Sequence, residues 1–316
     1  MLKNNSFIAL VKREVLENQN SFIKVPAIVL GIVILLVIAF VMGLTQFDFF
    51  HDSNMEGVSD FGDMVALASS EATKEGVPFN FAITAGYWGI SYLPLMILPF
   101  IVFFSLLGSL YEERRDRTIM FWKSMPISDW QEVLAKIVAS AVVAPMCVLA
   151  VIIVGQLIAA VILSLTSLVQ GGPFFVMWPL WTMFISWIHV FIVYMVYIAW
   201  ILPLLSWLVL ASAYAPRMPF MYGVLPPVLV AVVQGVFFDS TAFLEWMGER
   251  MSGIGIINDM DVNVNLDKAG SVEGILDFSI LGNLIGNVLM TGGFWFGLVV
   301  AGGFLYGAVE LRKRAI

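Results

Sequence analysis

The sequence predicts an all-α integral membrane protein that forms one transmembrane domain over residues 1–316. Hydrophobic residues make up 60% of the chain and charged residues only 12%, a balance that would leave a soluble domain without enough polar surface. The apolar residues gather in long runs, and a helix of about 20 residues covers the roughly 30 Å hydrocarbon core of a bilayer. The basic residues fall mainly between alternate runs, so they also predict which side each segment faces.

Residues 1–24 predict an amphipathic helix that lies at the membrane interface before the first span. Apolar residues such as Leu10 and Val11 recur there at helical spacing, and Lys12 and Arg13 add positive charge. No small-residue cleavage site follows the next apolar run, so we expect that run to remain as a membrane anchor.

Six apolar segments are long enough to be transmembrane helices, and polar segments separate them. Pro94 and Pro99 are expected to bend the second of these helices. The predicted spans are residues 25–44, 88–110, 137–168, 176–213, 220–238 and 283–309. The predicted extracytoplasmic excursions are residues 45–87 and 239–282, and the predicted cytoplasmic connector is residues 111–136.

Residues 176–213 are long for one span and short for two, and the distribution of charge decides between these possibilities. A hairpin here would place Arg217 and the basic residues 312–314 on the side opposite the connector. One long helix, kinked at Pro203, keeps every basic cluster on one side. We therefore predict a single span.

Six spans place both chain termini on the same side of the membrane as the connector. Only Lys74, Arg250 and Lys268 fall on the other side, so 13 of the 16 basic residues share the side of the connector. Because basic residues are enriched on the cytoplasmic side, both termini and the connector are predicted to be cytoplasmic. We expect a multi-pass protein of a bacterial cytoplasmic (inner) membrane.

The end of the chain carries pairs of glycines four residues apart, a spacing that lets a second helix approach closely. Ordinary packing within the chain and a helix face that slides during transport are both open interpretations. The paired residues are Gly282 and Gly286, Gly293 and Gly297, and Gly303 and Gly307.

The connector holds the densest run of charged residues in the chain. Residues 112–118 are expected to extend the second span as a helix. Pro126 favours a break, and Ser128 fits the first position of a capping box that would begin a new helix at Asp129. The apolar residues 119–122 lie between these helices. We interpret the connector as a firm helical knob, and a solvated hairpin with anchoring charges is the alternative.

Four groups of connector residues follow one another in a characteristic order. They are Tyr111-Glu112-Glu113-Arg114, Arg117-Thr118-Ile119, Lys123-Ser124-Met125-Pro126-Ile127-Ser128, and Lys136. This order resembles the ABC-2 type transporter permease family, the membrane subunits of ABC transporters. The motif is short, but the number of spans and their topology fit the family over essentially the whole chain. One departure is Asp116-Arg117, which stands where the family often has a glycine before the threonine.

The resemblance implies a permease subunit of an exporter, which pairs with a second copy or a paralogue and with two ATPase subunits. ATP and magnesium would bind to the ATPase, and no cofactor is expected in this chain. The connector would be the coupling helix that the ATPase moves, with Glu113, Arg114 and Arg117 as polar contacts. The residues implied in this coupling contact are Glu112, Glu113, Arg114, Arg117, Thr118, Phe121, Trp122, Pro126 and Ser128.

The residue types that the sequence lacks indicate that the energy for transport would come from another protein. The predicted spans contain no Asp, Glu, Lys or Arg between their boundary residues, whereas ion-coupled carriers keep such costly groups to bind ions or relay protons. No P-loop motif is present, so a separate ATPase would have to bind ATP. No catalytic or metal-binding constellation is apparent, so we do not expect an enzyme, and we expect no nucleic-acid partner.

Two other function classes remain open alongside the permease. A stand-alone channel or carrier would work in liposomes without an ATPase, and a membrane assembly scaffold would have a partner unrelated to ATP. Aromatic residues make up 14% of the chain and could line an apolar path. They suggest a hydrophobic or amphipathic substrate, such as a lipid, a peptide or a drug.

Overall fold

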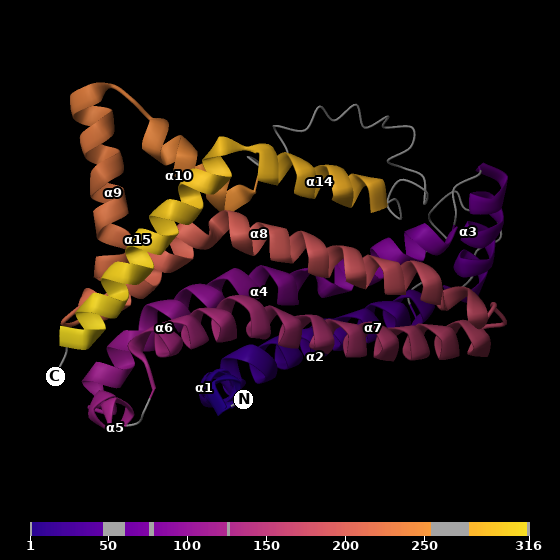
Figure 1. The fold of residues 1–316 in the computed structure, drawn as a ribbon. Helices are drawn as coiled ribbons and strands as arrows, with labels where there is room; N and C mark the ends of the chain where they lie inside the picture. Colours follow the sequence, from indigo (N-terminus) through magenta and orange to yellow (C-terminus); the bar gives the residue numbers. More distant parts are fainter. Residues whose placement is uncertain (1, 47–60, 76–78, 125–126, 254–277, 315–316) are drawn as a thin grey trace.

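The computed structural model of the chain describes residues 2–46, 61–75, 79–124, 127–253 and 278–314. The regular structure in these ranges is all helical, which confirms the predicted fold class. Six helical segments are long and apolar enough to cross a membrane, as predicted. Four long helices pack side by side along the molecule (Figure 1): α2 (Val25–Gln46), α4 (Phe79–Arg115), α7 (Ala144–Val169) and α8 (Leu180–Tyr214).

The N-terminal segment is helical, and it packs against the rest of the chain. Helix α1 (Leu2–Glu17) is followed by a π-helical turn at Asn20–Lys24 that leads directly into α2. Leu10 is buried where α1 packs on α6 (Asp129–Ile137). One face of the predicted interfacial helix is therefore covered by protein.

The capping box predicted at Ser128 is confirmed. The Ser128 hydroxyl accepts a hydrogen bond from the Gln131 backbone N–H at 3.3 Å, and the Gln131 side chain accepts one from the Ser128 N–H at 3.3 Å. Helix α6 continues through a π-helical turn at Val138–Val143 into α7. The helix of the third span therefore begins inside the connector, and α5 (Ile119–Lys123) precedes it.

Helix α8 runs without interruption through Pro203, so the chain does not turn back within residues 176–213. A 3-10 turn at Phe175–Met177 leads into it. Helix α3 (Phe61–Glu75) lies at the end of the molecule opposite α5 (Figure 1). It is tied to the link between α7 and α8, because the Gly62 N–H donates to the Gln170 side-chain oxygen at 3.0 Å.

The last predicted span, residues 283–309, is in fact divided between two helices. Helix α14 (Phe278–Met290) ends before Thr291, and α15 (Gly292–Arg314) follows it at once. The Thr291 hydroxyl donates to the Asn287 carbonyl at 2.9 Å, while the Thr291 carbonyl accepts from the Phe294 N–H at 3.0 Å. Two glycines, which have low helix propensity, follow Thr291, so a break in the helix costs little free energy here. As a result, the helix long enough to cross the membrane begins and ends later than predicted.

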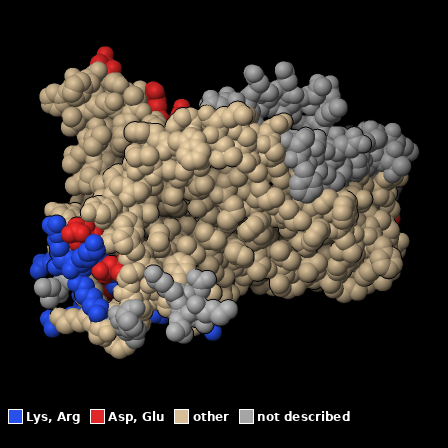
Figure 2. Space-filling view, in the orientation of Figure 1, with Lys and Arg blue, Asp and Glu red and all other residues tan. Residues whose placement is uncertain are grey.

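Helices α9 (Pro219–Phe238) and α10 (Ala242–Ser252) complete the chain that the structure describes. Helix α9 diverges from α15 (Figure 1) and packs near Gly223 on α8 and α4, and Gly223 is its only buried residue. Both chain termini lie toward the end of the molecule that carries α5 (Figure 1). On the face shown in Figure 2, lysine and arginine side chains gather at this same end, with acidic side chains among them.

Polar side chains hold α4, α7 and α8 together inside the bundle. Gln156 of α7 donates to the Ser91 hydroxyl of α4 at 2.9 Å and accepts from the Trp187 indole of α8 at 2.7 Å. Gln156 is buried, and its amide is paired on both sides. Such interhelical hydrogen bonds satisfy polar groups that have no water to bind in a membrane.

Candidate functional site

Helix α4 ends at Arg115, earlier than the helix predicted over 112–118, and the chain then turns sharply. Arg117 has a φ of 56°, in the left-handed region that glycine adopts without steric cost. This is the position before Thr118 where the permease family often has glycine. The turn therefore has the conformation that a glycine would favour, and in this chain it places the exposed side chain of Arg117 at the surface.

Helix α5 follows this turn and presents two large apolar side chains to the outside. Ile119 is buried, whereas Met120 and Phe121 are 59% and 57% exposed. The ring of Trp122 is half-buried and packs edge-on against Phe121, with 4.9 Å between the ring centroids. We call the exposed residues Arg117, Thr118, Met120 and Phe121 the α5 surface.

Next to α5 lies a group of six charged side chains that contact one another. We call this group the ion cluster. Its members come from four helices, which the sequence keeps far apart. They are Arg13 and Glu14 of α1, Glu113 of α4, Glu132 and Lys136 of α6, and Arg312 of α15.

Arg312 joins the end of α15 to both sides of the connector. Its Nη1 donates to Glu113 Oε2 at 2.5 Å, its Nε donates to Asp129 Oδ1 at 3.1 Å, and its Nη2 also donates to Glu132. Only 3% of the Arg312 side chain is exposed. The C-terminal end of α15 is therefore fixed to α4 and to α6 at the same time.

Lys136 and Arg13 connect α1 to the same two helices. Lys136 Nζ lies 2.9 Å from Glu14 Oε1 and 2.8 Å from Glu113 Oε1. Arg13 Nη1 lies 3.1 Å from Glu132 Oε1, and its guanidinium stacks on the Trp122 ring at 3.8 Å from the centroid. Through Trp122, the ion cluster touches α5 directly.

The ion cluster contains three bases and three acids, so its formal charges cancel. Five of its six side chains are less than 10% exposed, and Arg13 is 16% exposed. A buried charge that loses its partner costs several kcal/mol, roughly 3–5 kcal/mol in other proteins. Relative movement of these four helices would therefore have to exchange partners within the cluster rather than leave charges unpaired.

Two carboxyl groups at the edge of the site have shifted pKa values. Burial raises the pKa of Glu17, and the Glu14 carboxylate adds to this while Arg13 opposes it. A hydrogen bond from Arg115 lowers the pKa of Asp116. Glu17 therefore keeps its proton to a higher pH than a free glutamate does. Among the described residues, no group of His, Cys, Asp and Glu side chains is arranged to hold a metal ion.

The predicted coupling residues divide into exposed and internal side chains. Glu112, Arg117, Thr118 and Phe121 are exposed, and Trp122 is partly covered by Arg13. Ser128 is exposed, and its hydroxyl is used in the capping box of α6. Pro126 lies outside the described residues.

Glu113 and Arg114 have partners within the chain, and their predicted contact with an ATPase stays a prediction. Glu113 is buried in the ion cluster, where it meets Lys136 and Arg312. Arg114 donates to the carbonyl oxygens of Ser212 at 2.5 Å and Ala215 at 2.9 Å, at the end of α8. Both side chains therefore hold the connector to the bundle: Glu113 through the ion cluster, and Arg114 through the backbone carbonyl groups at the end of α8.

The predicted packing glycines also divide into two groups. A Cβ atom added to Gly307 would lie 3.2 Å from Leu210 of α8, so this glycine allows the close approach of a helix. A Cβ added to Gly297 would lie 2.6 Å from Nη1 of Arg250, so this glycine makes room for an arginine. A Cβ on Gly293 would also reach Arg250, at 3.9 Å. At Gly282, Gly286 and Gly303 an added Cβ would meet no atom within 4 Å.

Arg250 is a functional-looking residue that the sequence did not single out. It is buried on α10, its guanidinium lies 4.2 Å from the centroid of the Trp200 ring, and its Nη1 donates to the Trp200 carbonyl at 2.6 Å. Its Nη2 donates to the Gly293 carbonyl. Arg250 thus ties α10 to α8 and α15, and no local pattern in the sequence records these contacts.

Comparisons with protein-family models, with curated proteins and with solved structures find no match to this chain. The membrane character of the chain therefore rests on its own six long apolar helices. The resemblance to a permease family rests on the residues of the connector and on the order of the spans.

Proposed function

We propose that this chain is the membrane-spanning permease subunit of an ATP-driven ABC transporter. It works as an exporter of a hydrophobic or amphipathic substrate, and a separate pair of ATPase subunits binds ATP and magnesium. Two permease subunits, either two copies of this chain or this chain and a paralogue, share the ATPase pair. The observation that carries the proposal is the connector, in which the exposed α5 surface is attached to four helices by the ion cluster.

The α5 surface has the chemistry of a docking site. Met120 and Phe121 offer apolar contact area, and Arg117 adds a positive charge beside them. A cleft of about 270 Å³ opens beside it, lined by charged residues of both signs such as Lys123 and Asp129. An ATPase that holds these groups can pull or push on α5 without entering the membrane.

The ion cluster supplies the physical route from α5 to the spans. Trp122 contacts Arg13, Arg13 pairs with Glu132, and Glu132 pairs with Arg312. A displacement of α5 is therefore passed to α1, α6 and α15 as a rigid-body shift, which is a common form of coupled helix movement. No proton or metal chemistry in this chain is needed for such a step.

A mild-detergent pull-down of the tagged chain, with mass spectrometry of the proteins that come with it, tests this proposal. The informative variants are Phe121→Ala and Arg117→Ala, because both side chains are exposed and neither belongs to the ion cluster. Phe175→Ala is the matched control, since Phe175 is 82% exposed in the link between α7 and α8.

We expect a P-loop ATPase to be recovered with the wild type and with Phe175→Ala, and to be lost or strongly reduced with the two α5 variants. An ATPase that both α5 variants retain would place the docking surface elsewhere, with α1 as the next candidate. Recovery of no ATPase with the wild-type chain, from a host that expresses such subunits, would contradict the proposal.

A further inference from the structure

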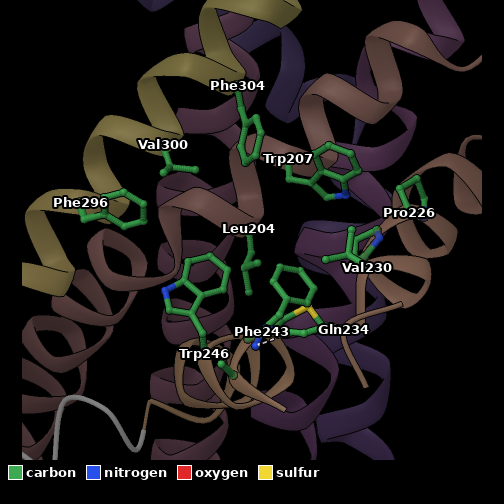
Figure 3. A pocket seen from close by; sticks show the side chains of 13 residues that line it. Leu204, Trp207, Pro226, Val230, Gln234, Phe243, Trp246, Phe296, Val300 and Phe304 are labelled. Carbon is green, nitrogen blue, oxygen red and sulfur yellow. Dashed lines mark hydrogen bonds between the residues drawn. The ribbon is translucent and has the colours of Figure 1, made fainter. Parts of the chain in front are cut away.

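An apolar pocket lies between α8, α9, α10 and α15, at a distance in the fold from the ion cluster. Its volume is about 560 Å³, within the range of about 300–1,000 Å³ that is usual for small-ligand sites. Figure 3 shows Phe296, Val300 and Phe304 of α15 on one wall and Pro226 and Val230 of α9 on the other.

Gln234 is the only side chain lining the pocket that is neither apolar nor aromatic, and its amide is already engaged. Its Oε1 accepts a hydrogen bond from the Phe243 N–H at 2.8 Å, at the start of α10. The indole N–H of Trp207 donates to the Gly223 carbonyl at 2.8 Å. A polar ligand would therefore find few hydrogen-bonding groups in this pocket, and each polar group that is buried without a partner costs several kcal/mol.

The mouth of the pocket opens on the outer surface of the helices. Val230 of α9 is 50% exposed and Phe296 of α15 is 63% exposed, although both side chains also line the pocket. Both helices are long and apolar enough to cross a membrane. The mouth therefore lies between two helices whose surroundings in a bilayer are hydrocarbon.

Helix α10 closes one end of the pocket. It turns Phe243 and Trp246 inward, with their rings stacked 6.1 Å apart, and its exposed residues include Glu245 and Glu249. A helix with aromatic residues on one face and charged residues on the other is typical of the boundary between hydrocarbon and water. The closed end is thus placed at the membrane boundary, and the mouth faces the apolar interior.

We propose that this pocket binds a single hydrocarbon chain, namely one acyl chain of a membrane lipid or of a lipid-like substrate. Apolar burial alone provides the affinity, because each buried methylene group contributes and no polar group has to be matched. The chain enters sideways between Val230 and Phe296, and its head group stays outside. Binding of a hydrocarbon chain in this pocket does not require an ATPase. Only the further step, that the bound lipid is the transported substrate, rests on the proposed function.

Photo-crosslinking in vesicles tests this inference directly. The full chain is reconstituted in phosphatidylcholine vesicles that contain a small fraction of a phosphatidylcholine with a diazirine midway along one acyl chain. After illumination, crosslinked peptides are mapped by mass spectrometry. We expect crosslinks at pocket residues such as Trp207, Phe243 and Val300, beyond those on residues that simply face the lipid.

Two filling variants and two matched controls separate the pocket from the general lipid surface. Val300→Phe and Val230→Phe put a ring into the pocket from different helices. Val299→Phe and Val232→Phe add the same ring on the same helices, at residues that are 74% and 53% exposed and do not line the pocket. Filling the pocket should lower its crosslink yield roughly tenfold, about the effect of losing two buried methylene groups. The control variants should leave the yield unchanged.

A second experiment, with the partner ATPase present, tests whether the bound hydrocarbon chain belongs to a transported lipid or to a resident one. Release of the labelled lipid on addition of ATP identifies a transported lipid, whereas retention identifies a resident one, and both results support the pocket as an acyl-chain site. Equal crosslinking of filling and control variants would overturn the inference. Crosslinks between Val230 or Phe296 of two copies of the chain, in place of lipid adducts, would overturn it as well.

Discussion

Arg312 shows how a single residue can hold the connector together. Its guanidinium meets Glu113, Glu132 and Asp129, which lie on α4 and α6. The desolvation of such a buried network cancels much of the attraction between its charges, so its net contribution to stability is small while it is complete. Removing Arg312 alone has a much larger effect on stability, because the carboxylates of Glu113 and Glu132 then stay buried without this partner.

Replacing Arg312 by methionine should therefore destabilise the protein strongly. We expect Arg312→Met to lower the free energy of unfolding by about 3–5 kcal/mol, because Glu113 and Glu132 lose a buried cation. Arg314→Met on the same helix is the control, since Arg314 is 75% exposed and pairs with Glu310 at the surface. Thermal unfolding in detergent measures the difference, and equal midpoints for the two variants would contradict this role of Arg312.

Two glycines on α15 should respond to alanine in opposite directions. Gly297→Ala would push its Cβ to 2.6 Å from Arg250 Nη1, so Arg250 must move from the carbonyls of Trp200 and Gly293. We expect a loss of about 1–3 kcal/mol, as for other overpacked sites.

Gly303→Ala is the matched control for this substitution, because its Cβ would meet no atom within 4 Å. It should raise stability by up to about 1 kcal/mol through its higher helix propensity. Thermal unfolding compares the two variants, and a Gly297→Ala protein that is as stable as Gly303→Ala would rule out the close fit of Arg250.

Individual residues were predicted from the sequence only where the signal is local. The capping box at Ser128 could be read because its two partners lie three residues apart. The pair of Arg13 and Glu132, by contrast, is separated by 119 positions, and that of Arg312 and Glu113 by 199. No periodicity or spacing records such a pairing, so the sequence alone does not show that Glu113 is buried.

At the scale of the element, helix α6 depends on its capping box. Ser128 satisfies the Gln131 N–H, one of the free N–H groups at the start of a helix, and the Gln131 side chain returns a bond to the Ser128 N–H. Ser128→Ala should cost about 1 kcal/mol, and Ser128→Asn should restore most of this, because asparagine is an equally good cap. Thermal unfolding of the three proteins tests it, and an unchanged Ser128→Ala protein would show that the cap contributes nothing.

The helices themselves were largely predictable, since long apolar runs leave few alternatives. The six membrane-length helices and the unbroken α8 agree with the predicted spans. The break between α14 and α15 near residue 291 was not predictable, because Thr291 and the glycines after it also occur within continuous transmembrane helices. Helix α4 also begins at Phe79, well before the predicted span, and the residues it adds there are mostly apolar, among them Phe81 and Ile83.

At the scale of the whole molecule, the gathering of basic side chains at one end (Figure 2) predicts that this end is cytoplasmic. Cysteine labelling tests it cleanly, because Cys147 is the single cysteine of the chain and can be replaced by alanine. In that background we expect Phe175→Cys to react with a membrane-impermeant maleimide on intact spheroplasts. Thr118→Cys should react only after permeabilisation, because we predict that α5 is cytoplasmic. The reverse pattern of labelling would invert the topology and exclude a cytoplasmic ATPase at α5.

The central claim for the whole molecule is that this chain moves its substrate only when an ATPase drives it. The most direct measurement is the transfer of a fluorescent lipid across liposomes that contain the chain alone, or the chain with the ATPase recovered in the pull-down. We predict no transfer above protein-free liposomes for the chain alone, and transfer that depends on ATP for the complex and is lost with Phe121→Ala. Transfer or ion leakage by the chain alone, without any ATPase, would contradict the account and identify a stand-alone channel or carrier.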